Sequence, residues 1–143
     1  MQRSTAGLLA LALLGAAPSA SPVGLWRTVD DHTGRERALV RIFENSGTLY
    51  GRVERIFDPA DAGKICGKCG DDRHDKPLLG LDILRGLKPD GDGAWSGGEI
   101  IDPETGSIYR ASAHLAEGGR DLVVRGYLLF SLLGRSQTWH REP

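Results

Sequence analysis

After its first twenty residues, the chain consists of eight short runs in which apolar and polar residues tend to alternate, separated by turns that mostly contain glycine. A period of two places successive side chains on opposite faces of a β-strand, so each run predicts a strand with one buried face. The expected strands cover residues 23–30, 35–43, 48–57, 78–87, 94–101, 107–115, 121–129 and 135–141.

The connections between these runs indicate how the strands are arranged. Most are short, which favours antiparallel neighbours in chain order, and residues 102–106 (Asp-Pro-Glu-Thr-Gly) are typical of a type I turn. Eight strands must also protect their edges, and closure into a barrel does so, with a two-sheet sandwich as the alternative. We therefore predict an all-β fold, a single eight-stranded antiparallel up-and-down barrel.

One run carries a competing pattern. Leu78, Leu81 and Leu84 recur every three residues, as they do on a helix face. Asp82 and Arg85 interrupt that helical stripe, so residues 78–87 are predicted to form a strand.

Composition narrows the classes of protein further. The 143 residues include 20 glycines, about twice the usual share, which agrees with many tight turns. Hydrophobic residues make up 40% and charged residues 26%, a globular balance that argues against a disordered chain. The formal net charge of −1 disfavours a nucleic-acid binder that relies on a basic surface.

The N-terminus is predicted to be a secretory signal peptide covering residues 1–20. Arg3 gives a positive start, residues 6–17 are uncharged and apolar, and small residues follow at Ser19 and Ala20. The apolar run is shorter than the roughly 20 residues that span a bilayer, so we expect no membrane span after cleavage. The barrel domain is then residues 21–143, and the protein is expected in the periplasm or outside the cell.

Two short segments resemble the lipocalin and fatty-acid-binding superfamily. Gly24-Leu25-Trp26 opens the first run, and Arg135 and Arg141 bracket Trp139 in the last. In that superfamily a tryptophan closes one end of the barrel and an arginine lies over it, a cation–π arrangement. The resemblance therefore implies a lipocalin-like, or calycin-like, barrel.

Longer segments, in chain order, are similar to the bacterial domain of unknown function 2147, a family of small exported proteins. The resemblance covers residues 22–141 and implies a lipocalin-like barrel with no established activity and no catalytic residues. It rests on Gly24-Leu25-Trp26-Arg27-Thr28, Cys66-Gly67-Lys68-Cys69, Pro77-Leu78-Leu79-Gly80-Leu81, Leu87-Lys88-Pro89-Asp90-Gly91-Asp92-Gly93, Trp95-Ser96-Gly97-Gly98 and Ser131-Leu132-Leu133-Gly134-Arg135-Ser136-Gln137-Thr138-Trp139.

The two cysteines, Cys66 and Cys69, lie in a long loop at residues 58–77. In an oxidising compartment such a close pair favours a local disulfide, which would restrain an Asp-rich loop. One alternative is a metal site that adds His74, with Asp71 or Asp75 as a further candidate ligand. The other is a redox pair. A zinc site normally needs a further ligand pair, and a reactive thiol needs a helix N-terminus beside it.

No catalytic motif stands out. Asp90-Gly91-Asp92-Gly93 resembles the start of a calcium loop, but Ile101 occupies the position of its closing acid. Gly-x-Ser-x-Gly, phosphate-binding and dinucleotide-binding signatures are absent from the sequence. We therefore expect neither an enzyme nor a cofactor.

The barrel interior is the candidate site. If Trp139 points inward, Arg135, Gln137 and Arg141 share its face, and an interior arginine needs an acidic partner, water or an anionic ligand. Small residues such as Ala111 leave room that either holds a ligand or is filled by larger neighbours. The residues expected to contact a ligand are Trp26, Tyr109, Tyr127, Arg135, Gln137, Trp139 and Arg141.

The sequence thus predicts non-covalent binding of a small apolar or amphipathic molecule, for instance a lipid-like acid whose carboxylate meets an interior arginine. One alternative is a cell-envelope interaction module with a filled core, whose partner docks on the apolar residues 128–133 or on the cysteine loop. The other is a thiol or metal protein centred on Cys66 and Cys69.

Overall fold

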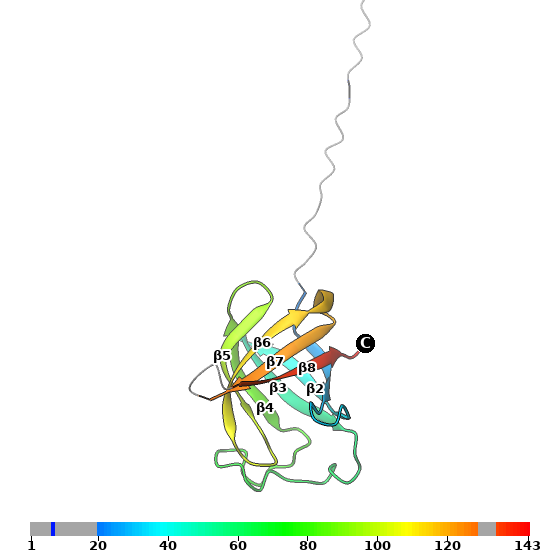
Figure 1. Ribbon diagram of the computed structural model, residues 1–143. Coiled ribbons are helices and arrows are strands. Elements are labelled where there is room, and N and C mark those ends of the chain that lie inside the picture. The colour runs from blue at the N-terminus through cyan, green and yellow to red at the C-terminus, as the bar shows by residue number, and fades with distance from the viewer. Residues whose placement is uncertain (1–6, 8–19, 129–133) are drawn as a thin grey trace, which may run out of the picture.

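The computed structural model, which describes residues 7, 20–128 and 134–143, is a closed barrel of eight antiparallel strands in chain order (Figure 1). The barrel closes because β8 pairs with β1, with Trp26 opposite Arg141. This confirms the predicted up-and-down barrel. The elements are β1 (Gly24–Val29), β2 (Glu36–Asn45), β3 (Thr48–Ile56), β4 (Asp82–Pro89), β5 (Ala94–Ile101), β6 (Ile108–Ala116), the 3₁₀ turn η1 (Glu117–Gly119), β7 (Asp121–Tyr127) and β8 (Gly134–Arg141).

The fourth strand begins later than the sequence pattern predicts. Residues 78–81 form a turn in front of β4, since Gly80 has a φ of 88°, a left-handed conformation that ends an extended run. The turn folds back onto β3, where the Gly80 N–H donates to the Val53 carbonyl at 2.8 Å and the Val53 N–H donates to the Leu81 carbonyl at 2.9 Å. The prediction of strand at residues 78–81 was therefore wrong.

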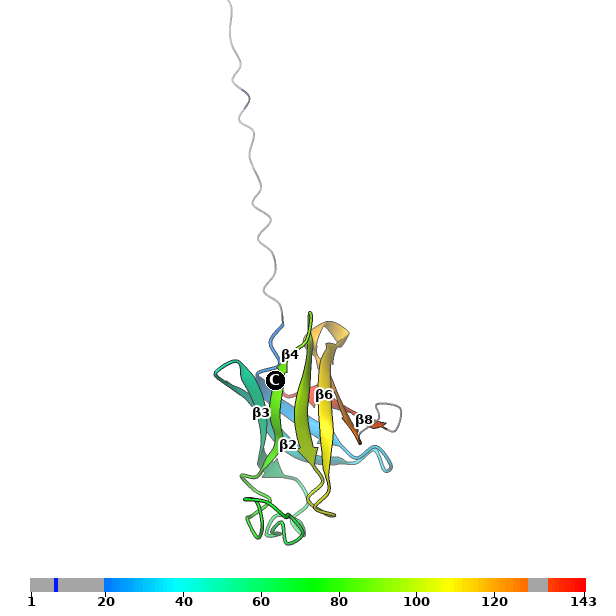
Figure 2. The ribbon, with the colours of Figure 1, turned by 90° about the vertical axis from the view of Figure 1, so that its left-hand side faces the viewer.

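The barrel has two different ends. Short turns join β2 to β3 and β4 to β5 at one end, where η1 and the segment before β1 also lie. We call this the closed end. The connections β1–β2, β3–β4 and β5–β6 lie at the opposite, open end, and the long β3–β4 loop, residues 57–81, folds beneath the barrel there (Figure 2).

Towards the closed end the interior is solid. On the inward face of β3, a Cβ added to Gly51 would lie 3.0 Å from the Leu84 Cβ and 3.1 Å from the Ile42 Cδ1, so the small residue is matched by large neighbours. Dense packing of this kind supplies most of the burial that stabilises a domain. The buried core comprises Trp26, Val40, Ile42, Leu49, Val53, Leu84, Leu87, Ala111, Ala113, Leu122, Val124 and Trp139.

Arg141 seals the closed end over Trp26, as the superfamily resemblance implies. Its guanidinium carbon lies 4.3 Å from the centre of the Trp26 ring. The same guanidinium donates to the carbonyl oxygens of Ser21 at 2.6 Å, Val23 at 3.2 Å and Gly119 at 2.9 Å. One side chain therefore ties the segment before β1, the η1 turn and β8 together.

Replacing Arg141 with alanine should lower the free energy of unfolding by about 2–3 kcal/mol, because charge-assisted hydrogen bonds and a cation–π contact are lost together. Urea denaturation followed by circular dichroism measures the change.

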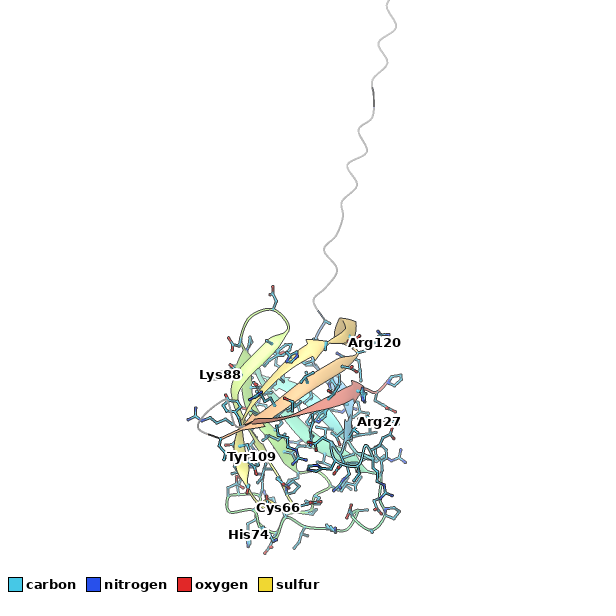
Figure 3. The ribbon with its side chains drawn as sticks, in the orientation of Figure 1. Arg27, Cys66, His74, Lys88, Tyr109 and Arg120 are labelled. Carbon is cyan, nitrogen blue, oxygen red and sulfur yellow. A yellow bond between two sulfur atoms is a disulfide. The ribbon has the colours of Figure 1, made fainter. Side chains whose placement is uncertain are left out.

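Arg120→Ala is the matched control, since exposed Arg120 lies at the same end and its side chain donates to the Glu117 carbonyl within its own turn (Figure 3). This variant should stay within about 0.5 kcal/mol of wild type. Equal losses in the two variants would show that Arg141 does not seal the barrel.

Candidate functional site

A cavity of about 810 Å³ occupies the half of the barrel nearer the open end. Its size falls within the range of about 300–1,000 Å³ typical of small-molecule sites. The inner walls are apolar and come from seven strands and the β3–β4 loop. They comprise Ala38, Val40, Val53, Ile56, Leu78, Leu81, Ile83, Ile100, Ile101, Tyr109, Val124 and Trp139.

Trp139 and Gln137 form a polar pair inside this apolar space. The Trp139 Nε1–H donates to the Gln137 Oε1 at 3.2 Å, which satisfies the hydrogen-bonding group of an indole that is 1% exposed. Both residues line the cavity, because the alternation of β8 directs them inward. A ligand would therefore meet the Gln137 amide on an otherwise apolar wall.

Four of the seven residues expected to contact a ligand line this cavity: Tyr109, Arg135, Gln137 and Trp139. Trp26 and Arg141 do not, since they pack on each other at the closed end. Tyr127 lies outside the lining as well, because on β7 it faces the side opposite to the lining residues Val124 and Gly126. The alternation of side chains along a strand predicts whether a residue of β8 faces the barrel interior. It does not predict how far along the barrel axis that residue lies.

Arg135 differs from the interior arginine that the sequence suggested. Its side chain lies at the cavity mouth, is 56% exposed and forms a two-pronged ion pair with Asp31 from the β1–β2 turn. The guanidinium lowers the pKa of Asp31 from 3.8 to about 2. The acidic partner that a charged arginine requires is thus supplied by the protein, and not by a ligand.

The mouth carries two further sets of ion pairs. Arg37 of β2 lies 2.9 Å from the Glu104 carboxylate in the β5–β6 turn and 3.6 Å from Asp30. In the β3–β4 loop, the Lys64 ammonium lies 2.6 Å from Asp61. The pKa of Arg37 is raised, chiefly by its hydrogen bond to Glu104, and that of Lys64 is raised by Asp61. Charged groups therefore border the opening while the walls behind them are apolar.

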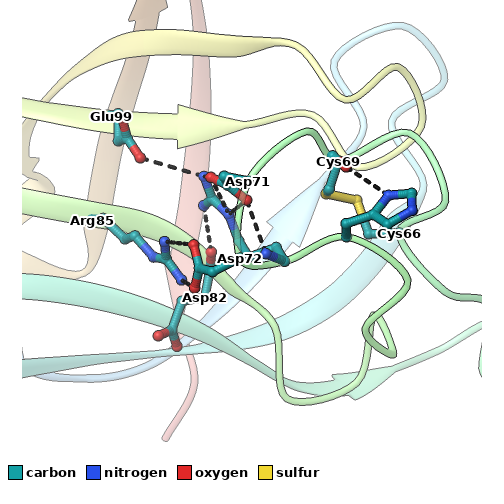
Figure 4. A network of polar contacts seen from close by, with 9 residues as sticks. Cys66, Cys69, Asp71, Asp72, Asp82, Arg85 and Glu99 are labelled. Carbon is teal, nitrogen blue, oxygen red and sulfur yellow. Dashed lines mark hydrogen bonds and ion pairs between the residues drawn. A yellow bond between two sulfur atoms is a disulfide. The ribbon is translucent and has the colours of Figure 1, made fainter.

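The β3–β4 loop is fixed by a buried arginine that the sequence analysis missed. Arg73 is 1% exposed, and its guanidinium donates to the Asp71 carboxylate at 2.6 Å, to the Asp82 carbonyl at 2.8 Å and to Glu99 at 3.3 Å (Figure 4). The last two residues belong to β4 and β5, so Arg73 fastens the loop to the barrel wall. An arginine within an Asp-rich segment is normally expected to be exposed to solvent. The local sequence therefore contains no signal that predicts the burial of Arg73.

Cys66 and Cys69 form the predicted disulfide. Both are fully buried and pack with Leu81 and Ile101 in a second small core beneath the barrel. The His74 ring, proposed as a ligand in the metal alternative, contacts the Cys69 carbonyl oxygen at 2.8 Å and not a sulfur. Within residues 20–128 and 134–143, no three His, Cys, Asp or Glu side chains gather as a metal site would require.

The leucine-rich stretches divide between the interior and the surface. Leu78 and Leu81 line the cavity, and Leu79 is 51% exposed outside it. Leu128 belongs to the lining as well, although it is 55% exposed. The remainder of the second stretch, residues 129–133, lies outside the described part of the chain.

A closed up-and-down barrel with one solid half and one hollow half defines the class of the protein as lipocalin-like. The chain belongs to the family described as "uncharacterized protein conserved in bacteria (DUF2147)", whose model matches residues 24–141. The family resemblance inferred from the sequence is thereby confirmed.

A solved structure supports the same fold. Protein HP1028 from Helicobacter pylori, described as belonging to the lipocalin family, superposes with a TM-score of 0.75 at 21% identity, covering 87% of this chain and 84% of that one. No curated protein sequence matches the chain. Among the described residues, no helix is both long and apolar enough to cross a membrane.

The Arg73 anchor generates a pH-dependent prediction. Hydrogen bonds from the Arg73 guanidinium and backbone N–H lower the pKa of Asp71 from 3.8 to about 2. The stabilising effect of this carboxylate is therefore complete above pH 4 and is lost as the pH falls towards 2. Asp71→Asn should reduce the free energy of unfolding at pH 7 by about 1–2 kcal/mol, and the difference from wild type should shrink below pH 4.

Urea denaturation at pH 7, 4 and 2.5 measures the free energy of unfolding of wild type and Asp71→Asn at each pH. Asp75→Asn in the same loop serves as the control, since this carboxylate is 60% exposed and, among the residues that the structure describes, its one ion-pair partner is exposed His74. Its effect should stay below about 0.5 kcal/mol. A difference between wild type and Asp71→Asn that does not change with pH would contradict the assignment.

Proposed function

We propose that this protein binds a small apolar or amphipathic molecule non-covalently in the cavity at the open end of the barrel. The observation that carries the proposal is an apolar space of about 810 Å³ that opens between charged groups at the mouth. Transfer of a hydrocarbon chain from water to these walls is favourable by about 25 cal/mol for each Å² buried. The Gln137 amide and the groups at the mouth would orient the polar part of the ligand.

Binding without catalysis fits the chemistry of the lining. Among its described residues there is no serine or cysteine, and the Thr28 hydroxyl donates to the Ala38 carbonyl. The basic groups at the mouth face carboxylates of the protein itself. We therefore propose a binding protein and not an enzyme.

We further propose that the protein acts in the periplasm or outside the cell. The disulfide between Cys66 and Cys69 supports this location, because structural disulfides persist mainly in oxidising compartments. The signal-peptide pattern of residues 1–20 points the same way and falls almost wholly outside the described residues.

The second candidate is an envelope protein that docks a partner at the open end. Four exposed hydrophobic side chains favour it: Ile65, Leu79, Ile108 and Leu128 are between 41% and 55% exposed, and all belong to loops or strand ends at that end of the barrel. A double Ile65→Ser, Leu79→Ser variant separates the two functions, because both side chains are exposed and neither lines the cavity. It should bind a small ligand as wild type does if the cavity is the functional site.

A cavity-filling variant tests the proposed site directly. Ala38 lines the cavity from β2, so phenylalanine at this position would occupy the space that a ligand needs. In a fluorescence titration with N-phenyl-1-naphthylamine, a neutral apolar probe, Ala38→Phe should bind at least about tenfold more weakly than wild type, a loss of about 1.4 kcal/mol.

Ser136→Phe adds the same ring at an exposed position of β8 and should bind the probe as wild type does. Thermal denaturation verifies that both variants are folded. Equal probe binding by wild type and Ala38→Phe, or no binding by wild type to the probe or to a series of C8–C16 alcohols, amines and acids, would rule out the cavity as the site.

A further inference from the structure

We propose that the mouth of the cavity selects amphiphiles with a cationic, ammonium-type head over carboxylates of the same chain length, and that Asp102 is the side chain that determines this preference. The inference rests on the proposed function and concerns the polar group of the ligand at that same site. It is the opposite of the expectation from the sequence, in which the carboxylate of a lipid-like acid binds an interior arginine.

The charges around the opening are unequal. Five carboxylates border it, against three basic side chains, which leaves an excess of two negative charges when histidine is neutral. Residues 129–133, outside the described part of the chain, are Leu-Phe-Ser-Leu-Leu and add no charge. The acidic groups are Asp30, Asp31, Asp61, Asp102 and Glu104, and the basic groups are Arg37, Lys64 and Arg135.

Each of the three basic groups already has a carboxylate partner. Arg135 forms its two-pronged pair with Asp31, Lys64 lies 2.6 Å from Asp61, and Arg37 lies 2.9 Å from Glu104. An incoming carboxylate would have to displace one of these partners in order to reach a cation. The excess negative charge of the opening would also repel it. Both effects weaken the binding of a carboxylate.

Asp102 differs from the other carboxylates at the mouth. It is half-buried in the cavity lining, and its Oδ1 accepts the Glu104 backbone N–H at 2.9 Å. Within the described residues, no basic side chain lies within 4.0 Å of it. Arg135 is near enough to interact with it electrostatically but is held by Asp31. The second oxygen of Asp102 can therefore accept hydrogen bonds from a bound ammonium group.

The turn that carries Asp102 is held in place from two sides. Its own backbone closes it, with the Asp102 N–H donating to the Ser107 carbonyl at 2.9 Å. The disulfide loop packs beneath it, since the Cys66 sulfur lies 3.8 Å from the Pro103 carbonyl oxygen and a Cβ at Gly106 would overlap the Lys68 backbone. A carboxylate fixed beside an apolar cavity discriminates between head groups better than a mobile one, because less conformational entropy is lost on binding.

The test compares three ligands that share a ten-carbon chain: decylamine, decanol and decanoate. Each competes with N-phenyl-1-naphthylamine for the purified protein at pH 8 and low salt, below the concentration at which it forms micelles. Decylamine should bind best and decanoate worst, with at least about a fivefold difference between them that decreases in 0.5 M salt. Ethylamine, which carries the charge without the chain, should not compete.

Asp102→Asn should weaken decylamine binding by about threefold, strengthen decanoate binding and leave decanol binding unchanged. Asp92→Asn makes the same charge change in the exposed β4–β5 turn at the closed end and should leave all three affinities as in wild type. Thermal denaturation verifies the fold of both variants.

The outcomes separate the two proposals. Equal or tighter binding of decanoate overturns the charge preference while the cavity remains a binding site. An unchanged order of affinities in Asp102→Asn overturns the role of Asp102. If none of the three ligands competes and the probe itself does not bind, the cavity is not the site, and both proposals fail.

Discussion

Closure of β8 onto β1 is the constraint on which the other features depend, because it makes all inward-facing side chains share one narrow interior. At the closed end Trp26 and the leucines of β3, β4 and β7 fill that space. Nearer the open end the inward positions of β1, β2 and β7 hold smaller residues, Thr28, Ala38 and Gly126, and a cavity remains. The filled core and the cavity, which were alternatives in the sequence analysis, therefore coexist in different halves of one barrel.

The β3–β4 loop is polar and rich in aspartate, yet it forms an ordered part of the cavity wall. It has few apolar residues, so a disulfide and a buried ion pair replace the hydrophobic burial that normally fixes a loop. Arg73 reaches backbone and carboxylate groups on β4 and β5, while Leu78 and Leu81 from the same loop face the cavity. The loop thus supplies both the apolar lining and part of the charged mouth.

The fold could be predicted from the sequence because it depends on local periodicity and on turn residues, which act over a few positions. Residues 78–81 were assigned wrongly since Gly80 adopts a left-handed conformation that the leucine pattern conceals. For the site, strand parity placed Tyr109, Gln137 and Trp139 on the lining correctly. It could not give depth along the barrel, so Trp26 and Arg141 were included although they seal the opposite end. The pairing of Arg135 with Asp31 joins residues 104 positions apart in the chain, and no local pattern encodes such a contact.

The contacts of Arg141 bring the N-terminal and C-terminal segments of the domain close together. Since Arg141 binds the backbone of Ser21 and its own strand pairs with β1, the two extremities of the domain meet at the sealed pole. The sheet is continuous around the barrel, and the covalent backbone is interrupted between β8 and β1, where the two strands are joined by hydrogen bonds alone. A peptide linker that joins Pro143 to Ser21 would make the backbone cyclic and restrict the unfolded chain, while the mouth at the far pole stays untouched.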